Sequence, residues 1–233
     1  MLNYITTGES HGQHLAVILE GMPSGLKVDL NFINEQMGKR QQGYGRGGRQ
    51  KIEQDRVQII GGMINDVTTG APIGCLLTNK DFKIKEMPEL FRPRPGHADL
   101  AGSLKYDQGI RPVLERASAR ETAMRVAVGG LCQLFLKNFG IEVVSHVVRI
   151  GAASVSGTEK MSIEDIRKAK KGSEVSCVDR KTDVLMISAS DEARRRKDTL
   201  GGQYEIRVTG VPIGLGSYVH YERKLDGRLA QIL

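Results

Sequence analysis

The sequence predicts an α+β fold in which helices and strands form packed layers. Two strand-like segments at 2–7 and 14–20 follow each other without an intervening helix. A long amphipathic helix is expected far from them, at 115–138, and the elements show no regular strand–helix–strand alternation. No GxGxxG sequence joins a strand to a helix, and no GxxxxGK[ST] phosphate loop occurs. A layered sandwich is therefore favoured over a parallel dinucleotide-binding sheet.

The N-terminal half is expected to be rich in strands and loops. GMPSG at 21–25 closes the second strand with a turn, and Asp29 is placed to cap a helix that ends near residue 37. The remaining segments are a loop at 39–51, strands at 57–62 and 73–78, and an irregular stretch with four prolines in and near 79–112.

The C-terminal half is expected to contain most of the helices. The helix at 115–138 carries a broad apolar face, and its Gly129-Gly130 pair implies close packing against another element. Ser162 predicts the start of a short helix, because its hydroxyl can accept a backbone N–H of the first turn. The other expected elements are an amphipathic helix at 181–197 and strands at 141–151 and 204–222.

Composition narrows the classes of protein. The 233 residues include 34 Lys and Arg against 27 Asp and Glu, a formal charge of +7, which favours anionic partners such as nucleic acid, acidic lipid or phosphorylated metabolites. No apolar run could cross a bilayer and no secretory signal is evident, so a cytoplasmic protein is expected. Absence of Trp leaves few platforms for stacking bases. The separated cysteines, Cys75, Cys132 and Cys177, are expected to be free thiols.

A basic, glycine-rich loop is the first candidate binding element. GYGRGGR at 43–49 follows Lys39 and Arg40, and its glycines let the backbone approach a ligand closely. Guanidinium groups and main-chain N–H groups of such a loop can surround a phosphate. Three interpretations stay open on these residues alone: a solvated loop, a nucleic-acid-binding segment, or a site for a phosphorylated metabolite.

A rigid segment, RPRPGHAD at 92–99, is the second candidate. Its alternating prolines fix the backbone, which suits the presentation of arginines and a histidine. His97 and Asp99 could form an oriented pair for proton transfer near neutral pH. The alternative is that Asp99 caps a helix and His97 faces solvent.

The third candidate is LERASARET at 114–122, at the expected start of the long helix. Small residues at 117–119 would leave N-terminal N–H groups open to an anion, with Arg116 and Arg120 one turn apart on one face. The alternative is a solvated face on which Glu121 pairs with Arg125.

The fourth candidate is GESHGQH at 8–14. Ser10 and His11 are adjacent, so their side chains diverge, and no Ser-His nucleophilic dyad is expected from them. His11 and His14 have no evident carboxylate or cysteine companion, so no metal site is expected.

Five motifs in register carry a resemblance that no single one establishes: GESHGQHLAVILEGMPSG, KRQQGYGRGGRQKIEQD, RPRPGHAD, ERASARETAMRVAVG, and DTLGGQYE with VPIGLGS. Together they resemble the chorismate synthase family over essentially the whole chain. The resemblance implies a β-α-β sandwich, a homotetramer, and the 1,4-anti elimination of phosphate from 5-enolpyruvylshikimate 3-phosphate to give chorismate. It also implies reduced FMN as cofactor, without net redox change, and NADPH as a candidate reductant of the flavin.

The resemblance further implies roles for individual residues. His11 would donate a proton near the leaving phosphate, and His97 would face the flavin. The substrate's anionic groups would be held by Arg40, Arg46, Arg49, Arg94 and Arg120. The flavin-binding stretch is matched by Arg116, Ala117 and Ser118, and Arg40 and Arg46 also match nicotinamide-cofactor contacts. Ala117 stands where the family pattern has a serine, so a hydroxyl contact to FMN would be missing there.

The resemblance stops short of the family's C-terminal motifs. Family chains run further, through additional FMN contacts and an Arg-Ser-Asp motif, so we expect 1–233 to be a single chorismate synthase domain that is truncated. Two other interpretations are a non-catalytic polyanion- or RNA-binding module and an inert fragment. With the motifs assigned, the positive charge is expected to serve a small phosphorylated substrate, with neither nucleic acid nor membrane as partner.

Overall fold

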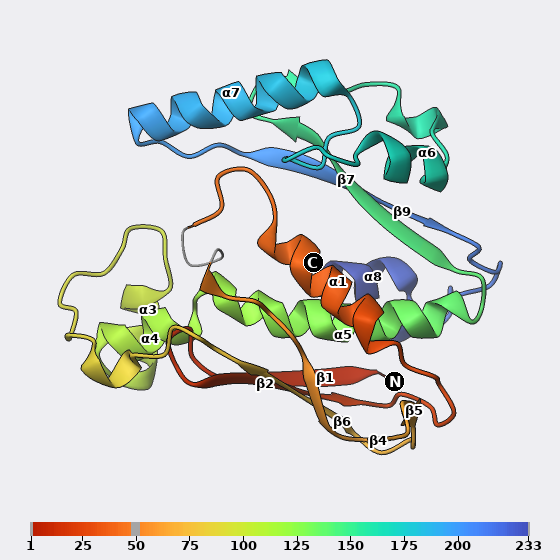
Figure 1. Cartoon of the computed structure of the whole chain (residues 1–233), viewed down its shortest axis with the longest axis horizontal. Coiled ribbons are helices and arrows are strands. Elements are labelled where there is room, and N and C mark those ends of the chain that lie inside the picture. Colours follow the sequence, from red (N-terminus) through yellow and green to blue (C-terminus); the bar gives the residue numbers. More distant parts are fainter. Residues whose placement is uncertain (1, 48–51, 233) are drawn as a thin grey trace. The chain divides into compact units, whose positions relative to one another are not determined.

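The structure is a computed structural model, and it describes residues 2–47 and 52–232. The chain divides into two compact units, Met1–Phe135 with Ser173–Val175, and Leu136–Gly172 with Ser176–Leu233 (Figure 1). Each unit combines helices with an antiparallel sheet, as expected for an α+β protein.

The first unit is built on a four-stranded antiparallel sheet of order β1-β2-β6-β3. Its strands are β1 (Asn3–Thr7), β2 (His14–Glu20), β3 (Gln58–Gly61) and β6 (Ile73–Thr78). All four were predicted from the sequence. A small hairpin, β4 (Met63–Ile64) and β5 (Val67–Thr68), follows β3. Asn65 and Asp66 form its two-residue turn with φ of 50° and 61°, which suits the twist of a hairpin.

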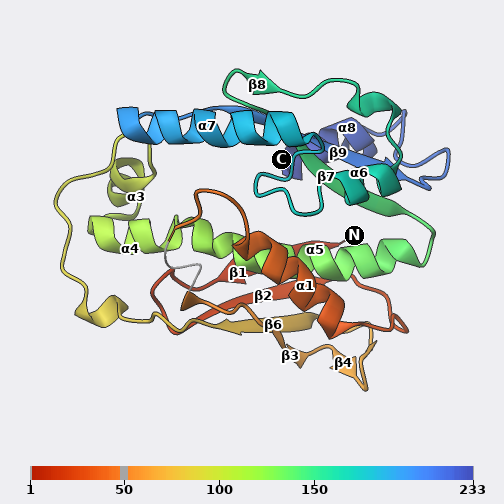
Figure 2. The same cartoon turned by 45° about the horizontal axis from the view of Figure 1, so that its top comes forward.

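The core of the first unit lies on one face of this sheet. Alternate residues of β2 and β6 are buried, and helices α1 (Leu30–Gln41) and α5 (Thr122–Lys137) cover them, as Figures 1 and 2 show. Gly130 of α5 packs so closely that an added Cβ would lie 3.3 Å from Ile33 of α1. The glycine pair was expected to require such packing, and Gly130 does.

Helix α1 begins as predicted and ends later than predicted. The Asp29 carboxylate accepts the N–H groups of Asn31 and Phe32, at 2.9 and 3.4 Å. The helix continues to Gln41, so Lys39 and Arg40 are helical and the expected loop at 39–51 starts too early. The extra turn is held by Arg40, which donates to the carbonyl of Ala119 at 3.0 Å, and by Gln41, which donates to the carbonyl of Glu53 at 2.6 Å.

The stretch between β6 and α5, expected to be mainly irregular, contains two helices; a helix starting near Asp99 was one of the alternatives left open by the sequence. They are α3 (Asp99–Tyr106) and α4 (Ile110–Arg116), preceded by a short 3₁₀ turn, η1 (Ile84–Glu86). Pro112 lies in the first turn of α4, where its missing N–H costs no hydrogen bond. The predicted helix at 115–138 is in fact broken: α4 ends at Arg116, a 3₁₀ turn η2 (Ala119–Glu121) follows, and α5 starts at Thr122.

The second unit has a three-stranded antiparallel sheet of order β8-β7-β9. Its elements are β7 (Glu142–Ile150), β8 (Ala153–Ser154), η3 (Thr158–Lys160), α6 (Ile163–Ala169), α7 (Arg180–Arg196), β9 (Gly202–Thr209), η4 (Tyr221–Arg223) and α8 (Leu225–Ile232). Ser162 caps α6, as predicted, and the Asp165 side chain in turn accepts the backbone N–H of Ser162, which was not predicted. Helix α7 confirms the helix expected at 181–197. The strand expected at 204–222 ends at Thr209, because Gly210 turns with φ of 75° and Pro212 has no N–H to donate.

Two further expectations concern cysteines and membranes. Cys75, Cys132 and Cys177 are thiols that form no disulfide, and burial raises the pKa of Cys75 to about 12. Within 2–47 and 52–232, no helix is long and apolar enough to span a membrane.

Candidate functional site

His11 lies in the turn between β1 and β2, in the first unit. Gly8 enters this turn with φ of 102°, and an added Cβ would lie only 2.4 Å from the carbonyl oxygen of His14, so the position requires glycine. Asn79, just after β6, donates its side-chain amide to the carbonyls of Ser10 and Gly12, at 3.2 and 2.7 Å. The histidine turn, residues 8–13, is therefore fixed by the end of a neighbouring strand.

Glu115 holds His11 from the other side. Its carboxylate atom Oε2 accepts the backbone N–H of His11 at 3.0 Å and lies 2.8 Å from the ring atom Nδ1. The backbone carbonyl of Glu115 also accepts the N–H of Ser10, at 3.0 Å. The second carboxylate oxygen, Oε1, accepts from Arg111 at 3.3 Å. The side chain of Glu115 is fully buried, whereas 21% of the His11 side chain is exposed.

Arg120 points into the interior next to this turn. Its Nε and Nη2 atoms donate to Asn79 Oδ1 at 3.0 and 2.9 Å, and Nη1 donates to Asp55 Oδ2 at 2.7 Å. Glu53 Oε2 lies 3.8 Å from its Nη2 atom. Only 6% of the Arg120 side chain is exposed, so this guanidinium mainly joins two buried carboxylates to Asn79.

Arg40 reaches the same carboxylate from the last turn of α1. Its guanidinium donates to Asp55 Oδ2 at 3.3 Å, to Thr122 Oγ1 at 3.1 Å and to the carbonyl of Ala119 at 3.0 Å. Burial lowers the pKa of Arg40, and the charge of Asp55 opposes that effect. Arg40 and Arg120 are thus brought together around Asp55; with Asn79 and Glu53 these residues form the arginine cluster.

Arg116 and Arg120 do not share a helix face, which corrects the sequence prediction. Arg116 is exposed at the end of α4 and donates to the carbonyls of Thr6 and Gly8, at 2.8 and 3.1 Å. Because the helix breaks between the two residues, the Arg120 side chain points into the interior, toward Asp55 and Asn79. The N–H of Ala117 is already bonded to the carbonyl of Val113 at 2.9 Å, so it does not offer an open N-terminal N–H group as expected.

Asp99 pairs with Arg94, and not with His97 as one of the two alternatives proposed. Arg94 donates to Asp99 through its backbone N–H, Nε and Nη2, each at 2.9 Å. The hydrogen bond from the Arg94 side chain is the main reason that the pKa of Asp99 falls to about 2. His97 is exposed and donates its Nδ1–H to the carbonyl of Pro95 at 2.9 Å, as in the solvent-facing alternative.

The remaining predicted residues have few contacts in the structure or lie outside the part it describes. Arg46 is exposed, and its Nε donates to the carbonyl of Gln42 at 3.2 Å. Ser118 is half-buried, and its hydroxyl oxygen accepts the N–H of Arg120 at 3.3 Å. Arg49 lies outside the described residues.

Several residues that organise this site were missed by the sequence analysis: Glu53, Asp55, Asn79, Asp81, Arg111 and Glu115. Glu53 and Asp55 fall within the basic motif KRQQGYGRGGRQKIEQD, but the sequence analysis gave them no role. Acidic residues within an arginine-rich segment are a usable signal, since a carboxylate that becomes buried needs a cationic or hydrogen-bonding partner. Asn79 directly follows a predicted strand, where functional polar residues concentrate.

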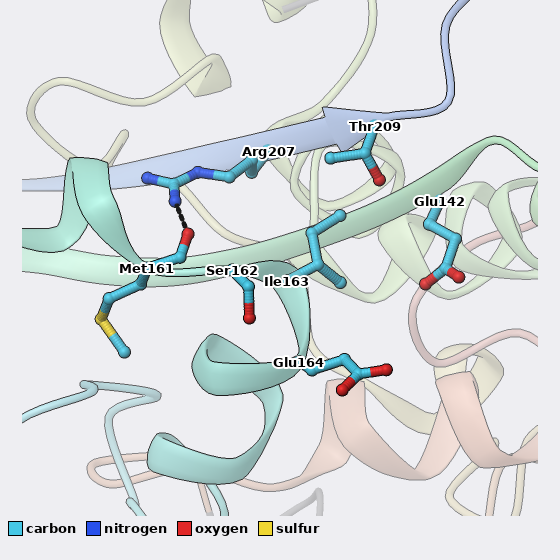
Figure 3. A pocket seen from close by; sticks show the side chains of 7 residues that line it. All are labelled: Glu142, Met161, Ser162, Ile163, Glu164, Arg207 and Thr209. Atoms are coloured by element: carbon cyan, nitrogen blue, oxygen red, sulfur yellow. Dashed lines mark hydrogen bonds between the residues drawn. The ribbon is translucent and has the colours of Figure 1, made fainter.

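The second unit contains a separate depression of about 400 Å³ at the start of α6. Figure 3 shows its lining, in which the Arg207 guanidinium bonds to the carbonyl of Met161. Arg207 also donates to the Thr158 carbonyl at 2.8 Å and to Glu205 at 2.6 Å. None of the predicted site residues lines this depression.

A buried histidine lies on β7 of the same unit. The Nε2 atom of His146 is 3.0 Å from Glu205 Oε2, but the contact does not have the geometry of a hydrogen bond, so we treat it as electrostatic. Neither ring nitrogen has a hydrogen-bond partner among the residues that the structure describes. Burial lowers the pKa of His146, and the charge of Glu205 opposes this.

No group of three or more His, Cys, Asp or Glu side chains in the described ranges could hold a metal ion. The candidate donors of the first unit are guanidinium groups, a histidine and a serine hydroxyl, which suit organic anions and phosphates.

Comparison with known proteins decides the family. The family model described as chorismate synthase matches residues 2–233, across both compact units. The chain belongs to the chorismate synthase family. The family predicted from the five motifs is therefore confirmed.

Two chorismate synthases illustrate how similar the chain is to known members. The chorismate synthase of Carboxydothermus hydrogenoformans is 50% identical over 245 residues, and that of Alkaliphilus metalliredigens is 48% identical over 245 residues. Each match covers 100% of this chain and 64% of the relative. A crystal structure of a chorismate synthase superposes with a TM-score of 0.82 at 36% identity, covering 99% of this chain and 63% of the other. The chain thus spans less than two thirds of the length of these chorismate synthases.

Proposed function

We propose that the protein containing this chain catalyses the elimination of phosphate from 5-enolpyruvylshikimate 3-phosphate to give chorismate. In this reaction the C–O bond to phosphate and a C–H bond on the same ring break, a new C=C bond forms, and inorganic phosphate and a proton leave. The observation that carries the proposal is the setting of His11: a fixed, part-exposed imidazole beside the arginine cluster, on a chain of the chorismate synthase family.

The residues have chemistry that suits these tasks. His11 would transfer a proton to the departing phosphate from Nε2 of its imidazolium form, which carries a proton on both ring nitrogens, since Nδ1 faces Glu115. Arg40, Arg46, Arg49 and Arg94 would bind the anionic groups of the substrate. For Arg120 we propose a supporting role beside them, because its guanidinium is buried against Asp55 and Asn79.

Reduced FMN is part of this proposal. The exposed guanidinium of Arg116 and the half-buried hydroxyl of Ser118 are donors that fit an anionic flavin or its phosphate. Ala117 supplies no hydroxyl, and its N–H is used within α4. When bound, reduced FMN would supply an electron transiently to help expel phosphate. His97, exposed on its loop, would contact the flavin edge.

Other features are proposed on the family resemblance alone. They are a homotetramer, a cytoplasmic location, NADPH as a reductant of the flavin with Arg40 and Arg46 as its contacts, and a single catalytic domain that includes both compact units. The match of one family model to 2–233 supports the last of these.

The direct test is anaerobic turnover of the enolpyruvyl substrate with photoreduced FMN, measured as phosphate and chorismate released. We expect His11→Ala to lower kcat by about 10²–10⁴-fold, the usual contribution of a positioned acid or base. His14→Ala is the matched control, since His14 is exposed and bonds only weakly, at 3.3 Å, to Thr78. Wild-type protein that binds FMN but releases no phosphate would reject the proposal.

A further inference from the structure

We infer that Glu115 is a positioning residue for His11: it accepts the Nδ1–H, so the neutral imidazole is the Nδ1–H tautomer and Nε2 is the nitrogen that takes up a proton and passes it on. The inference rests on the proposed function only for the role of His11 in turnover. The tautomer itself can be measured independently of any activity.

The donors around Glu115 determine the direction of the contact. A backbone N–H and a guanidinium can only donate, so the hydrogen bonds from His11 N and from Arg111 require acceptor oxygens on both sides of the carboxyl group. The carboxylate oxygen at 2.8 Å from Nδ1 therefore accepts a hydrogen bond that the ring Nδ1–H donates. The hydrogen bond at one ring nitrogen sets the state of the other.

The orientation of the ring is fixed as well as its tautomer. Three hydrogen bonds connect residue 115 to residues 10 and 11, two of them to backbone N–H groups. The carbonyl of His11 in turn accepts the N–H of Ile84 at 3.1 Å. Because Glu115 is fully buried and also held by Arg111, the imidazole has a rigid support on its inner side. Nε2 is the ring nitrogen that does not contact Glu115.

A second carboxylate, that of Asp81, lies near the imidazole ring of His11. Asp81 Oδ2 lies 3.7 Å from Nε2 of His11, which is beyond hydrogen-bond length, and its other oxygen lies 3.3 Å from the Lys83 ammonium. The Glu115 carboxylate is 2.8 Å from the ring and the Asp81 carboxylate is 3.7 Å from it, so Glu115 determines which ring nitrogen carries the proton. Asp81→Asn is consequently a matched control for Glu115.

The test is nitrogen NMR of the histidine side chains, at a pH where the imidazole is neutral. The His11 signals are assigned by their loss in His11→Gln. We expect an Nδ1–H tautomer in the wild type and in Asp81→Asn, and a shift toward Nε2–H in Glu115→Met, which has similar length but no strong acceptor. Glu115→Gln should keep the Nδ1–H form, since its amide oxygen can accept. An Nε2–H tautomer in the wild type would overturn the inference without any Glu115 variant having to fold.

Kinetics then separate positioning from simple packing. We expect Glu115→Met to lower kcat by about 10- to 100-fold, part of what a positioned proton donor contributes, with KM and FMN affinity changed less than about threefold. Glu115→Gln should recover most of kcat. A Glu115→Met protein with wild-type tautomer, or with unchanged kcat, would refute the assignment. Absence of turnover in the wild type would reject the proposed function, while the NMR result would still decide the tautomer.

Discussion

Arg120→Met should destabilise the first unit strongly, because the substitution leaves buried carboxylates without their partner. Arg120 is 6% exposed, and Asp55 and Glu53 are 1% and 2% exposed. Removing one member of a buried ion pair costs about 3–5 kcal/mol. Asp55 would retain Arg40 at 3.3 Å, and Glu53 would retain the backbone N–H groups of residues 80 and 81. We therefore expect Arg120→Met to lower the free energy of unfolding by about 3 kcal/mol, the lower end of this range.

The assay is urea unfolding followed by circular dichroism, since the chain has no Trp. With a slope of about 1–3 kcal/mol per molar urea, the midpoint should fall by about 1 M or more. Arg125→Met is the matched control: Arg125 is 54% exposed and pairs with Glu121 one turn away, so its loss should cost under about 0.5 kcal/mol.

A double substitution tests whether Arg120 and Asp55 stabilise the fold through their mutual interaction. Arg120→Met combined with Asp55→Asn removes both charges, so it should cost less than the sum of the two single changes by about 1 kcal/mol or more. An Arg120→Met protein within about 1 kcal/mol of wild type at unchanged slope would refute this account. A higher KM with unchanged stability would instead favour the direct substrate contact predicted from the sequence.

Two further predictions concern pH. The folded-state pKa of Asp99 is about 2, below the unfolded value of about 3.9, so its stabilisation is complete above about pH 4 and is lost as pH falls through about 2. Asp99→Asn should be less stable than wild type at neutral pH, and urea unfolding at several pH values should show this gap closing between about pH 4 and 2. Burial lowers the pKa of His146, so the unfolded chain takes up its proton first and stability should decline as pH drops below about 6.5. His146→Phe should flatten this decline, and a slope as steep as that of wild type would contradict the assignment.

Local signals in the sequence were sufficient for much of the fold. Asp29 and Ser162 were recognised as helix caps because a cap depends on residues within one turn. The strands of the first sheet were recognised from short apolar runs between turns. The end of β9 was missed because strand propensity continues past Gly210, while the backbone turns there.

The site was harder to predict because its contacts join distant segments. The break between α4 and α5 exists where Arg120 turns toward Asp55 and Asn79, which lie 65 and 41 positions away in the sequence. Helical periodicity contains no information about such partners, so Arg116 and Arg120 were placed on one face. The histidine turn was among the predicted candidates, but its partner Glu115 is 104 positions away and was not predicted.

The short return of the chain to the first unit has a practical consequence for dissecting this protein. Residues Ser173–Val175 belong to the first unit, and the carbonyl of Glu174 accepts the N–H of Tyr44 at 2.8 Å. A fragment cut after Phe135 would therefore lose an acceptor for the glycine-rich loop that carries Arg46. The two units are compact but not separable by a single cut, so loss of ligand binding in such a fragment would not show that the second unit contacts the ligand.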